Sequence, residues 1–195
     1  MRYWKGFRDG IPIALGYLSV SFAFGIQATS LGLTPLQAVL ISLLNVTSAG
    51  QLAGLQLMTV GAGLPEMALT QLTINLRYAL MSISLSQKLD ESMNTLHRLL
   101  ISFANTDEVF AVASSQKGKV GRAYLYGLTN GPVAGWVLGT ALGALAGGLL
   151  PDSVTNALGI AIYGMFLAII LPPAKKEKPV RIVVLIAIAV SLLFN

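Results

Sequence analysis

The chain has 195 residues, of which 54% are hydrophobic and 11% charged, with a net charge of +5 and a mean hydropathy of +0.72. This composition is too apolar for a soluble domain of this size and predicts a protein embedded in a lipid bilayer. The absence of cysteine and the single histidine exclude disulfide frameworks and metal sites built from thiolates or several imidazoles. The basic residues lie in short gaps between apolar runs, which indicates membrane topology and not a nucleic-acid partner.

Seven apolar runs are long enough to cross a bilayer as helices, because about 20 residues at about 1.5 Å each cover its hydrocarbon core. The runs are continuously apolar instead of alternating, which favours helices over strands. The sequence therefore predicts an all-α polytopic membrane protein with a single transmembrane domain over residues 1–195. The predicted spans, numbered as segments 1 to 7, are residues 11–31, 36–60, 65–87, 98–115, 122–150, 154–171 and 180–195.

The basic residues are divided unequally between alternate gaps. If the N-terminus is cytoplasmic, the cytoplasmic gaps hold ten Lys and Arg residues, whereas the outer gaps hold only Lys88 and Arg98. Cytoplasmic loops of membrane proteins are enriched in Lys and Arg. The bias predicts seven spans with the N-terminus in the cytoplasm.

Two short patterns recur along the chain and predict an internal repeat. The pattern N-x-x-x-A-G-x-x-x-G begins at Asn45 in segment 2 and at Asn130 in segment 5, and a Ser-Phe-Ala triplet occurs in segments 1 and 4. Segments 1–3 are therefore expected to correspond to segments 4–6, with the second copy inverted because each copy has an odd number of spans. The predicted repeats are residues 11–87 and 98–171, followed by an additional C-terminal span at 180–195.

Three segments have a composition that interrupts helices. In segment 5, Asn130 is followed by Gly131 and Pro132, which offer a cap, a joint and a first-turn proline. Asn105 and Thr106 in segment 4 have the form of a helix start before two acidic residues. In segment 2, polar and small residues follow Asn45 within an apolar run, namely Thr47, Ser48, Gly50 and Gln51. Broken helices of transporters place helix termini at the substrate. The alternative is that these residues only allow close helix packing.

Charged residues inside predicted spans are candidates for function. Arg77 lies in segment 3, and Asp107 and Glu108 lie in segment 4, where each charge costs roughly 2.5 to 3.5 kcal/mol unless it is paired or hydrated. One interpretation is a buried ion pair between Arg77 and either Asp107 or Glu108 that fixes helix register. The other is that a carboxylate accepts the substrate ammonium or a coupling proton, while Arg77 or a helix N-terminus binds the substrate carboxylate. Both can hold at once.

The candidate site is assembled from the interrupted segments and these charges. The candidate substrate-binding residues are Asn45, Thr47, Ser48, Gly50, Gln51, Asn75, Arg77, Asp107, Glu108, Asn130 and Trp136, with Asp107 and Glu108 as candidates for proton coupling. A second pattern, of glycines at 135, 139, 143 and 147, predicts a helix face that a neighbouring backbone approaches closely. No phosphate-cradling glycine loop, no histidine-based metal motif and no nucleophile with a histidine base emerges, so we expect no enzyme.

Motifs along nearly the whole chain resemble the AzlC family, the large subunits of branched-chain amino-acid exporters. They are Gly10-Ile11-Pro12, Ser48-Ala49-Gly50-Gln51, Asn75-Leu76-Arg77-Tyr78, Asp107-Glu108-Val109-Phe110, and Gly135-Trp136-Val137-Leu138-Gly139-Thr140 with Gly143. The resemblance implies export of branched-chain amino acids, with methionine as a further candidate, across the cytoplasmic membrane. It also implies no cofactor, coupling to the proton motive force and a small hydrophobic AzlD-like partner subunit. Members often carry His where this chain has Tyr78, so no proton role carries over there.

Two other functions fit the same features. A channel or passive pore for a small ion or solute would use the intramembrane charges as a selectivity constriction. A non-transporting assembly subunit would use the glycine face to dock its partner.

Overall fold

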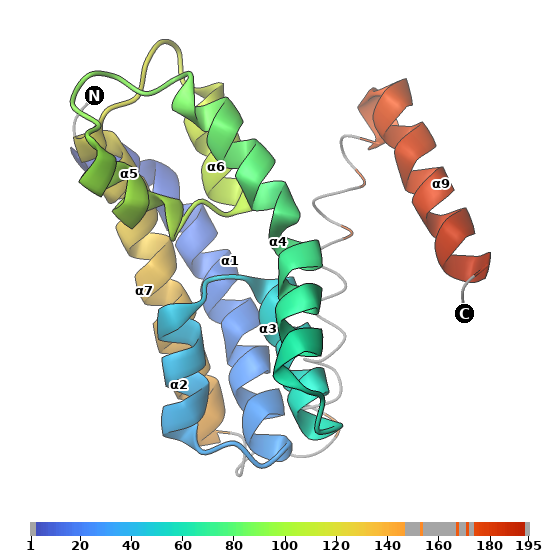
Figure 1. The fold of residues 1–195 in the computed structure, drawn as a ribbon. Coiled ribbons are helices and arrows are strands. Elements are labelled where there is room, and N and C mark those ends of the chain that lie inside the picture. Colours follow the sequence, from blue (N-terminus) through green and yellow to red (C-terminus); the bar gives the residue numbers. More distant parts are fainter. Residues whose placement is uncertain (1–2, 147–152, 154–166, 168–170, 172–173, 194–195) are drawn as a thin grey trace. The chain divides into compact units, whose positions relative to one another are not determined.

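The computed structural model of the chain describes residues 3–146, 153, 167, 171 and 174–193. The chain forms two compact units, Met1–Pro151 and Asp152–Asn195. Every extended regular element in the described residues is a helix, which agrees with the predicted all-α class (Figure 1). In the first unit they are α1 (Tyr3–Ser30), α2 (Pro35–Leu44), α3 (Ser48–Thr59), α4 (Leu64–Ser86), α5 (Thr95–Ser102), α6 (Asp107–Ser115) and α7 (Arg122–Ala146).

The second unit contains α9 (Lys178–Leu193), in which no residue is buried. This helix coincides with predicted segment 7, of which the last two residues lie outside the described part. Predicted segment 6, residues 154–171, lies outside it except for two single positions.

Helices α1 and α7 run parallel and pack backbone to backbone. A Cβ added to Gly10 would lie 2.6 Å from the carbonyl oxygen of Leu128, and one added to Gly135 would lie 2.6 Å from that of Ala14. Further along both helices, Gly143 lies against Phe22. The predicted glycine face is thus confirmed over residues 135–143, and Gly147 lies outside the described part. Only residues without a Cβ allow this approach.

Helices α2 and α3 form a hairpin, called here the first hairpin. Thr34 begins it with a capping box, because its hydroxyl accepts from the Gln37 amide at 3.2 Å and Pro35 takes the first helical position. The chain is extended at Asn45 and Thr47, where α2 ends and α3 begins. Phe24, Ala28, Ala38, Leu55 and Ala144 form one apolar cluster. Both ends of the first hairpin therefore lie at the end of the bundle where α1 finishes.

The direction of α3 follows from its contacts with α4. The Thr47 hydroxyl bonds Asn75, the Gly50 carbonyl accepts from Gln71, and Gly54 lies 3.6 Å from Met67, measured from an added Cβ. As residue numbers rise along α3, the residue numbers of the contacting partners on α4 fall. The two helices are therefore antiparallel. The first hairpin reaches the middle of the bundle and returns.

Helices α5 and α6 form the second hairpin, which enters from the other end. Asn94 caps α5 by accepting from the His97 amide at 3.0 Å, and the His97 ring bonds the Tyr126 hydroxyl near the start of α7 at 3.0 Å. Helix α6 runs parallel to α4, because Asp107 pairs with Arg77 and Lys88 donates to the Ser114 carbonyl. The two hairpins point toward each other in Figure 1.

These hairpins correct part of the predicted topology. The breaks predicted in segments 2 and 4 are confirmed, but neither segment crosses the bundle, so the prediction that both are full spans is wrong. The break predicted in segment 5 is also wrong, because α7 is continuous from Arg122 to Ala146 with Pro132 in its interior. Pro132 is buried, and the close packing on α1 holds the helix together despite the backbone hydrogen bond that proline removes.

The predicted repeat changes accordingly. Its alignment of segment 2 with segment 5 pairs a broken helix with a continuous one, and the structure does not support that pairing. In the structure, α1 is followed by the first hairpin at one end of the bundle, and α4 is followed by the second hairpin at the other end (Figure 1). A long helix and the hairpin after it thus occur twice, in opposite directions.

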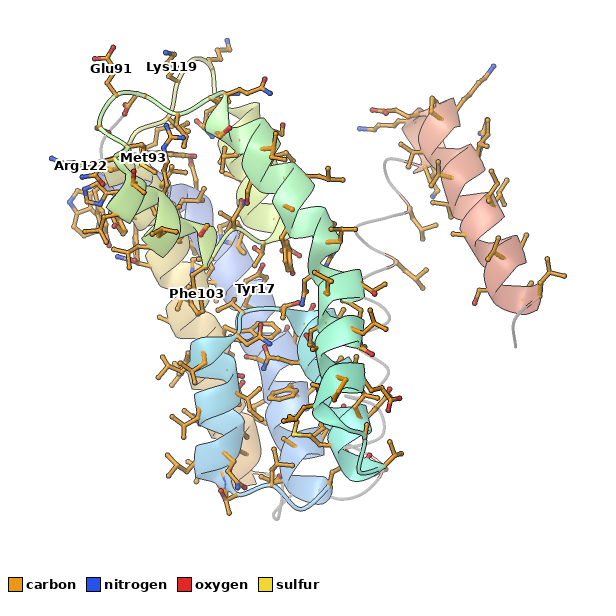
Figure 2. The ribbon with its side chains drawn as sticks, viewed as in Figure 1. Tyr17, Glu91, Met93, Phe103, Lys119 and Arg122 are labelled. Atoms are coloured by element: carbon orange, nitrogen blue, oxygen red, sulfur yellow. The ribbon has the colours of Figure 1, made fainter. Side chains whose placement is uncertain are left out.

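Basic side chains gather at one end of the first unit, the end that holds the start of α1 and is called here the N-terminal end. Lys5 donates to Gln116 at 2.6 Å, and the Arg122 amide donates to the Ser92 hydroxyl at 3.0 Å. Figure 2 shows Glu91, Lys119 and Arg122 together there. Lys88 and Arg98, expected on the opposite side, belong to this end because the second hairpin enters from it. The described loops at the opposite end, residues 31–34 and 60–63, contain no Lys or Arg.

The outer surface carries many apolar side chains, and the largely apolar interior also holds several polar ones. On α4, Leu69, Leu72, Leu76, Leu80 and Ile83 recur at helical spacing and are each at least 60% exposed. Ser42 and Thr140 are completely buried, and Gln51 is 2% exposed. Among the described helices, α1 alone combines the length and hydropathy of a membrane span. Exposed apolar stripes of this extent suit lipid or a protein partner.

Candidate functional site

The breaks of the two hairpins meet beside Tyr17 of α1. The buried Tyr17 hydroxyl lies 2.5 Å from both Thr106 Oγ1 and Glu108 Oε2, and both residues belong to the start of α6. A phenol has one proton, so Tyr17 donates to the carboxylate and accepts from the Thr106 hydroxyl. Figure 2 shows Tyr17 and Phe103 at mid-height, where the second hairpin turns. Helix α1 thereby fixes the position of one carboxylate at the centre of the unit.

The second carboxylate is paired. Arg77 of α4 forms an ion pair with Asp107, and its guanidinium lies 5.0 Å from the Tyr78 ring centroid. The side chains of Arg77 and Asp107 are 40% and 31% exposed, so the pair faces open space instead of being sealed in the core. The predicted pairing of Arg77 with Asp107 is present, but the expectation that it is buried is wrong, and its charges remain accessible to a ligand.

Thr47 organises the break of the first hairpin. It is 3% exposed, its hydroxyl donates to Asn75 Oδ1 at 2.9 Å, and it accepts from the Tyr78 hydroxyl at 3.2 Å. Because these bonds use its side chain, Thr47 makes no capping bond to α3. The first amides of α3 therefore keep the partial positive charge of an uncapped helix N-terminus.

Gly50 and Asn75 connect this break to α4. Gln71 donates to the Gly50 carbonyl at 2.8 Å and accepts from Asn75 Nδ2 at 3.2 Å. A Cβ on Gly50 would lie 2.7 Å from the Gln71 side-chain oxygen and 2.8 Å from the Thr47 methyl group. A larger residue at this position would displace the Gln71 or Thr47 side chain, because α3 starts directly against α4.

Gln51 and Trp136 form a wall behind the breaks. Trp136 donates to Gln51 Oε1 at 2.8 Å, Gln51 donates to Ser42 at 2.9 Å, and Ser42 bonds Thr140 at 2.7 Å. All four residues are buried, and the Trp136 ring meets Tyr17 edge-on at 5.2 Å. Gln51 and Trp136 thus hold Tyr17 and the first hairpin in place.

The remaining predicted residues divide into two groups. Asn45 and Ser48 are half-buried and lie on either side of the first break. Asn130 lies apart from it, exposed on α7, where it donates to the Tyr3 hydroxyl at 3.0 Å. Sequence reasoning missed Tyr17, Ser42, Thr106 and Gln71. Their signal was a polar side chain within an apolar helix, which is weak at any single position.

The arrangement suits a small zwitterion. Asp107 and Glu108 offer negative charge at the second break, whereas Arg77 and the start of α3 offer positive charge near the first. A ligand with an ammonium and a carboxylate on one carbon would find complementary charge on two sides. The described residues contain no cluster of three or more His, Asp or Glu side chains suited to a metal ion.

Comparison with known proteins assigns the family. A model of the AzlC protein family matches residues 12–150. The chain belongs to the AzlC family. It is 31% identical over 183 residues to the inner membrane protein YgaZ of Escherichia coli (strain K12), a match that covers 90% of this chain and 75% of YgaZ.

Other AzlC-like relatives are also membrane proteins. A membrane protein of Archaeoglobus fulgidus is 36% identical over 173 residues, covering 88% of this chain and 75% of the relative. A membrane protein of Helicobacter pylori (strain 26695) is 28% identical over 153 residues, covering 74% and 66%. No solved structure matches the chain significantly. The chain is therefore an AzlC-family membrane protein, in agreement with its apolar outer surface.

Proposed function

We propose that this chain is the large subunit of a secondary transporter that exports branched-chain amino acids, and methionine as a further candidate, across the cytoplasmic membrane. The convergence of two oppositely inserted hairpins on Arg77, Asp107 and Glu108 carries this proposal. Charged groups within a membrane protein are costly and mark substrate or ion pathways. The family assignment supports the same class of function.

The orientation of the chain in the membrane follows from the basic residues at the N-terminal end of the first unit. Positive residues favour the cytoplasmic side, so the N-terminus and the loops at 87–94 and 116–121 lie in the cytoplasm. The first hairpin then enters from outside and the second from inside. A tilt of either hairpin would open the central cluster to one side only, which is what alternating access requires.

The substrate binds by exchange with the ion pair. Its carboxylate takes the place of Asp107 beside Arg77 and the first amides of α3, and its ammonium lies between Asp107 and Glu108. Glu108 has no cationic partner among the described residues and is held by the Tyr17 hydroxyl, so we assign the coupling proton to Glu108. Driving force comes from the proton motive force, with no cofactor.

The exposed leucine face of α4 offers room for the small hydrophobic AzlD-like subunit. Leu72, Leu76 and Leu80 are each at least 60% exposed. In the bilayer this face contacts either lipid or a partner of the same apolar character.

Counterflow of labelled leucine in proteoliposomes tests the proposal, with and without the small partner. We expect saturable counterflow that Asp107→Asn and Glu108→Gln both abolish while insertion and assembly remain normal. The matched control is Glu66→Gln, because Glu66 is an exposed carboxylate in the first turn of α4, at the opposite end from the basic loops. Single-channel currents would support a passive pore instead, and changed assembly without any flux would support an assembly subunit.

A further inference from the structure

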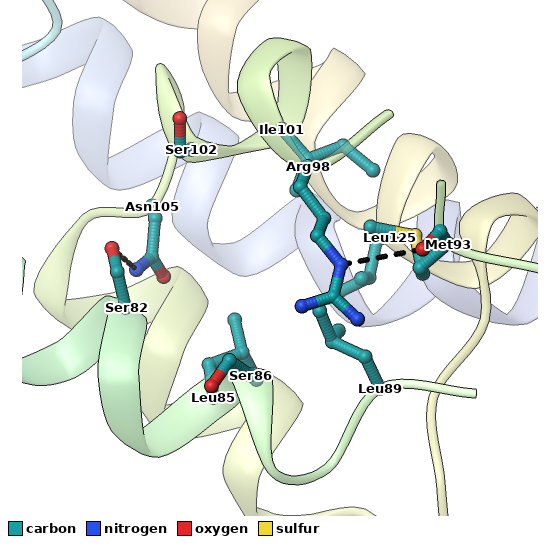
Figure 3. A pocket seen from close by; sticks show the side chains of 10 residues that line it. All are labelled: Ser82, Leu85, Ser86, Leu89, Met93, Arg98, Ile101, Ser102, Asn105 and Leu125. Atoms are coloured by element: carbon teal, nitrogen blue, oxygen red, sulfur yellow. Dashed lines mark hydrogen bonds between the residues drawn. The ribbon is translucent and has the colours of Figure 1, made fainter. Parts of the chain in front are cut away.

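A cavity of about 210 Å³ lies near the N-terminal end, and Arg77, Asp107 and Glu108 are not among the residues that line it (Figure 3). It is an open cavity lined by the end of α4, by α5 and by the start of α7. Its walls are mostly apolar and include Leu85, Ile101 and Leu125. At roughly 30 Å³ per water molecule, this volume equals about seven waters, or a molecule with a similar number of non-hydrogen atoms.

Asn105, a residue that lines this cavity, has one polar atom with an unmet hydrogen bond. Asn105 is 5% exposed, and its Nδ2 donates to Ser82 at 3.1 Å. Its Oδ1 is fully buried and has no hydrogen-bond partner in the described part of the chain. A buried acceptor without a donor is destabilising, and a ligand donor would relieve that cost.

A cation lines the same cavity. Arg98 Nε donates to the Met93 carbonyl at 3.2 Å, and Figure 3 shows the guanidinium held between α5 and the loop before it. That bond uses one of five N–H donors and leaves the two terminal nitrogens to bind a carboxylate as a fork.

We propose that this cavity binds a small aliphatic carboxylate that also carries a hydrogen-bond donor, of which a branched-chain amino acid is the simplest example. The carboxylate binds Arg98, the donor binds Asn105 Oδ1, and the aliphatic body lies against Leu85, Ile101 and Leu125. The choice of an amino acid rests on the proposed function. Asn105 precedes Thr106, whose hydroxyl bonds Tyr17, so a ligand here contacts the break that carries the central carboxylates.

The lack of native cysteine allows a test local to the cavity. Ser102 lines the cavity and is exposed, so Ser102→Cys gives one reactive thiol at the site. Ser115→Cys is the matched control, because each serine donates to the carbonyl three residues earlier, at 2.8 and 2.9 Å, and both are exposed. The probe is leucine, and the measurement is the rate of alkylation by a maleimide.

Leucine is expected to slow alkylation of Ser102→Cys at least tenfold and to leave Ser115→Cys unchanged. Adding Arg98→Gln is expected to weaken this protection at least tenfold, whereas Arg77→Gln in the central site leaves it intact. Two leucine analogues test the site without a further variant. We expect 4-methylpentanoate, which lacks the ammonium, to bind several-fold more weakly than leucine. We expect 3-methylbutylamine, which lacks the carboxylate, to give no protection.

Three results would overturn the inference: no protection by leucine, protection that persists unchanged with Arg98→Gln, or protection by anionic phospholipid vesicles alone. The last would identify a lipid headgroup as the occupant. Leucine counterflow without protection of Ser102→Cys removes this site and leaves the proposed function standing. Protection of Ser102→Cys without leucine counterflow supports this site and removes the proposed transport function.

Discussion

Replacing Tyr17 by phenylalanine removes one hydroxyl and leaves the ring against Trp136. In the structure that hydroxyl lies 2.5 Å from Glu108 and 2.5 Å from Thr106. A hydrogen bond to a charged group contributes about 1.5 to 3 kcal/mol, and 1.4 kcal/mol corresponds to a factor of ten. Because Glu108 is only half-buried and water can replace part of this bond, we expect a fall in leucine counterflow of about tenfold.

The same variant is expected to lose stability. Thr106 is 6% exposed, so its hydroxyl keeps no partner once the phenol is removed, at a cost of about 1 to 3 kcal/mol. For a chain of this length each kcal/mol lowers the melting temperature by about 2–4 °C. A loss of stability alone does not identify a transport role, so a second tyrosine is needed for comparison.

Tyr124→Phe supplies that comparison. Tyr124 is completely buried and donates to a carboxylate oxygen of Asp9 at 2.8 Å, near the N-terminal end of the first unit. Both variants are expected to melt earlier, but only Tyr17→Phe slows counterflow per folded molecule. Equal counterflow in the two variants, whether normal or reduced, would refute a specific role for Tyr17 at the substrate site.

Three further changes test other parts of the account. Arg77→Gln and Asp107→Asn are each expected to stop leucine counterflow, and the double variant recovers melting temperature but not flux; recovered flux would reduce the pair to a structural contact. Gly135→Ala is expected to lower the free energy of unfolding by more than about 1 kcal/mol, because its Cβ would lie 2.6 Å from a carbonyl oxygen of α1. Gly16→Ala, with no described atom within 4 Å, is expected to raise it by about 0.5–1 kcal/mol; equal effects in thermal denaturation would argue against the tight helix pair. A serine hydroxyl holds the pKa of Asp90 below its ordinary value, so its stabilising contribution is complete above about pH 4 and is lost as the pH falls through the lowered pKa. The melting-temperature difference from Asp90→Asn should therefore disappear in acid, and a difference that is constant with pH would contradict this assignment.

The sequence predicted helix class and two of three breaks because these depend on local chemistry. Asn45 and Thr47 stop a helix, and Asn105 with Thr106 starts one, whatever surrounds them. Pro132 carries a similar local signal but lies in a continuous helix, because close packing between α1 and α7 opposes the break. Local signals fail where tertiary packing is strongest.

Topology was harder to predict because hydropathy measures the length of an apolar run and not its direction. Residues 36–60 are apolar over a full span, yet the chain turns at Asn45 and returns. For the same reason Lys88 and Arg98 were expected at the opposite end from Lys5 and Lys119, whereas they lie at the same end of the first unit. With the second hairpin in place, the basic residues that accompany α1 to α7, apart from Arg77, lie at one end, which fits the positive-inside rule better than the seven-span arrangement did.

The candidate site was predicted in part. Arg77, Asp107 and Glu108 stood out because charges are rare in apolar segments. Tyr17 did not, because an isolated tyrosine in an apolar run is common at membrane interfaces. Its role depends on the fold of the second hairpin, which brings residues 106 and 108 to α1.

The sidedness of loop 87–94 tests the central claim, that two hairpins enter from opposite sides and meet at the substrate. Single cysteines at Glu91 and Lys117, both exposed, are labelled with a membrane-impermeant maleimide in intact and permeabilised cells. The two-hairpin fold places both positions on one side of the membrane and Ala62→Cys on the other. A seven-span chain would instead place Glu91 opposite Lys117 and put Ala62 on the side of Lys117, and that result would contradict the site described here.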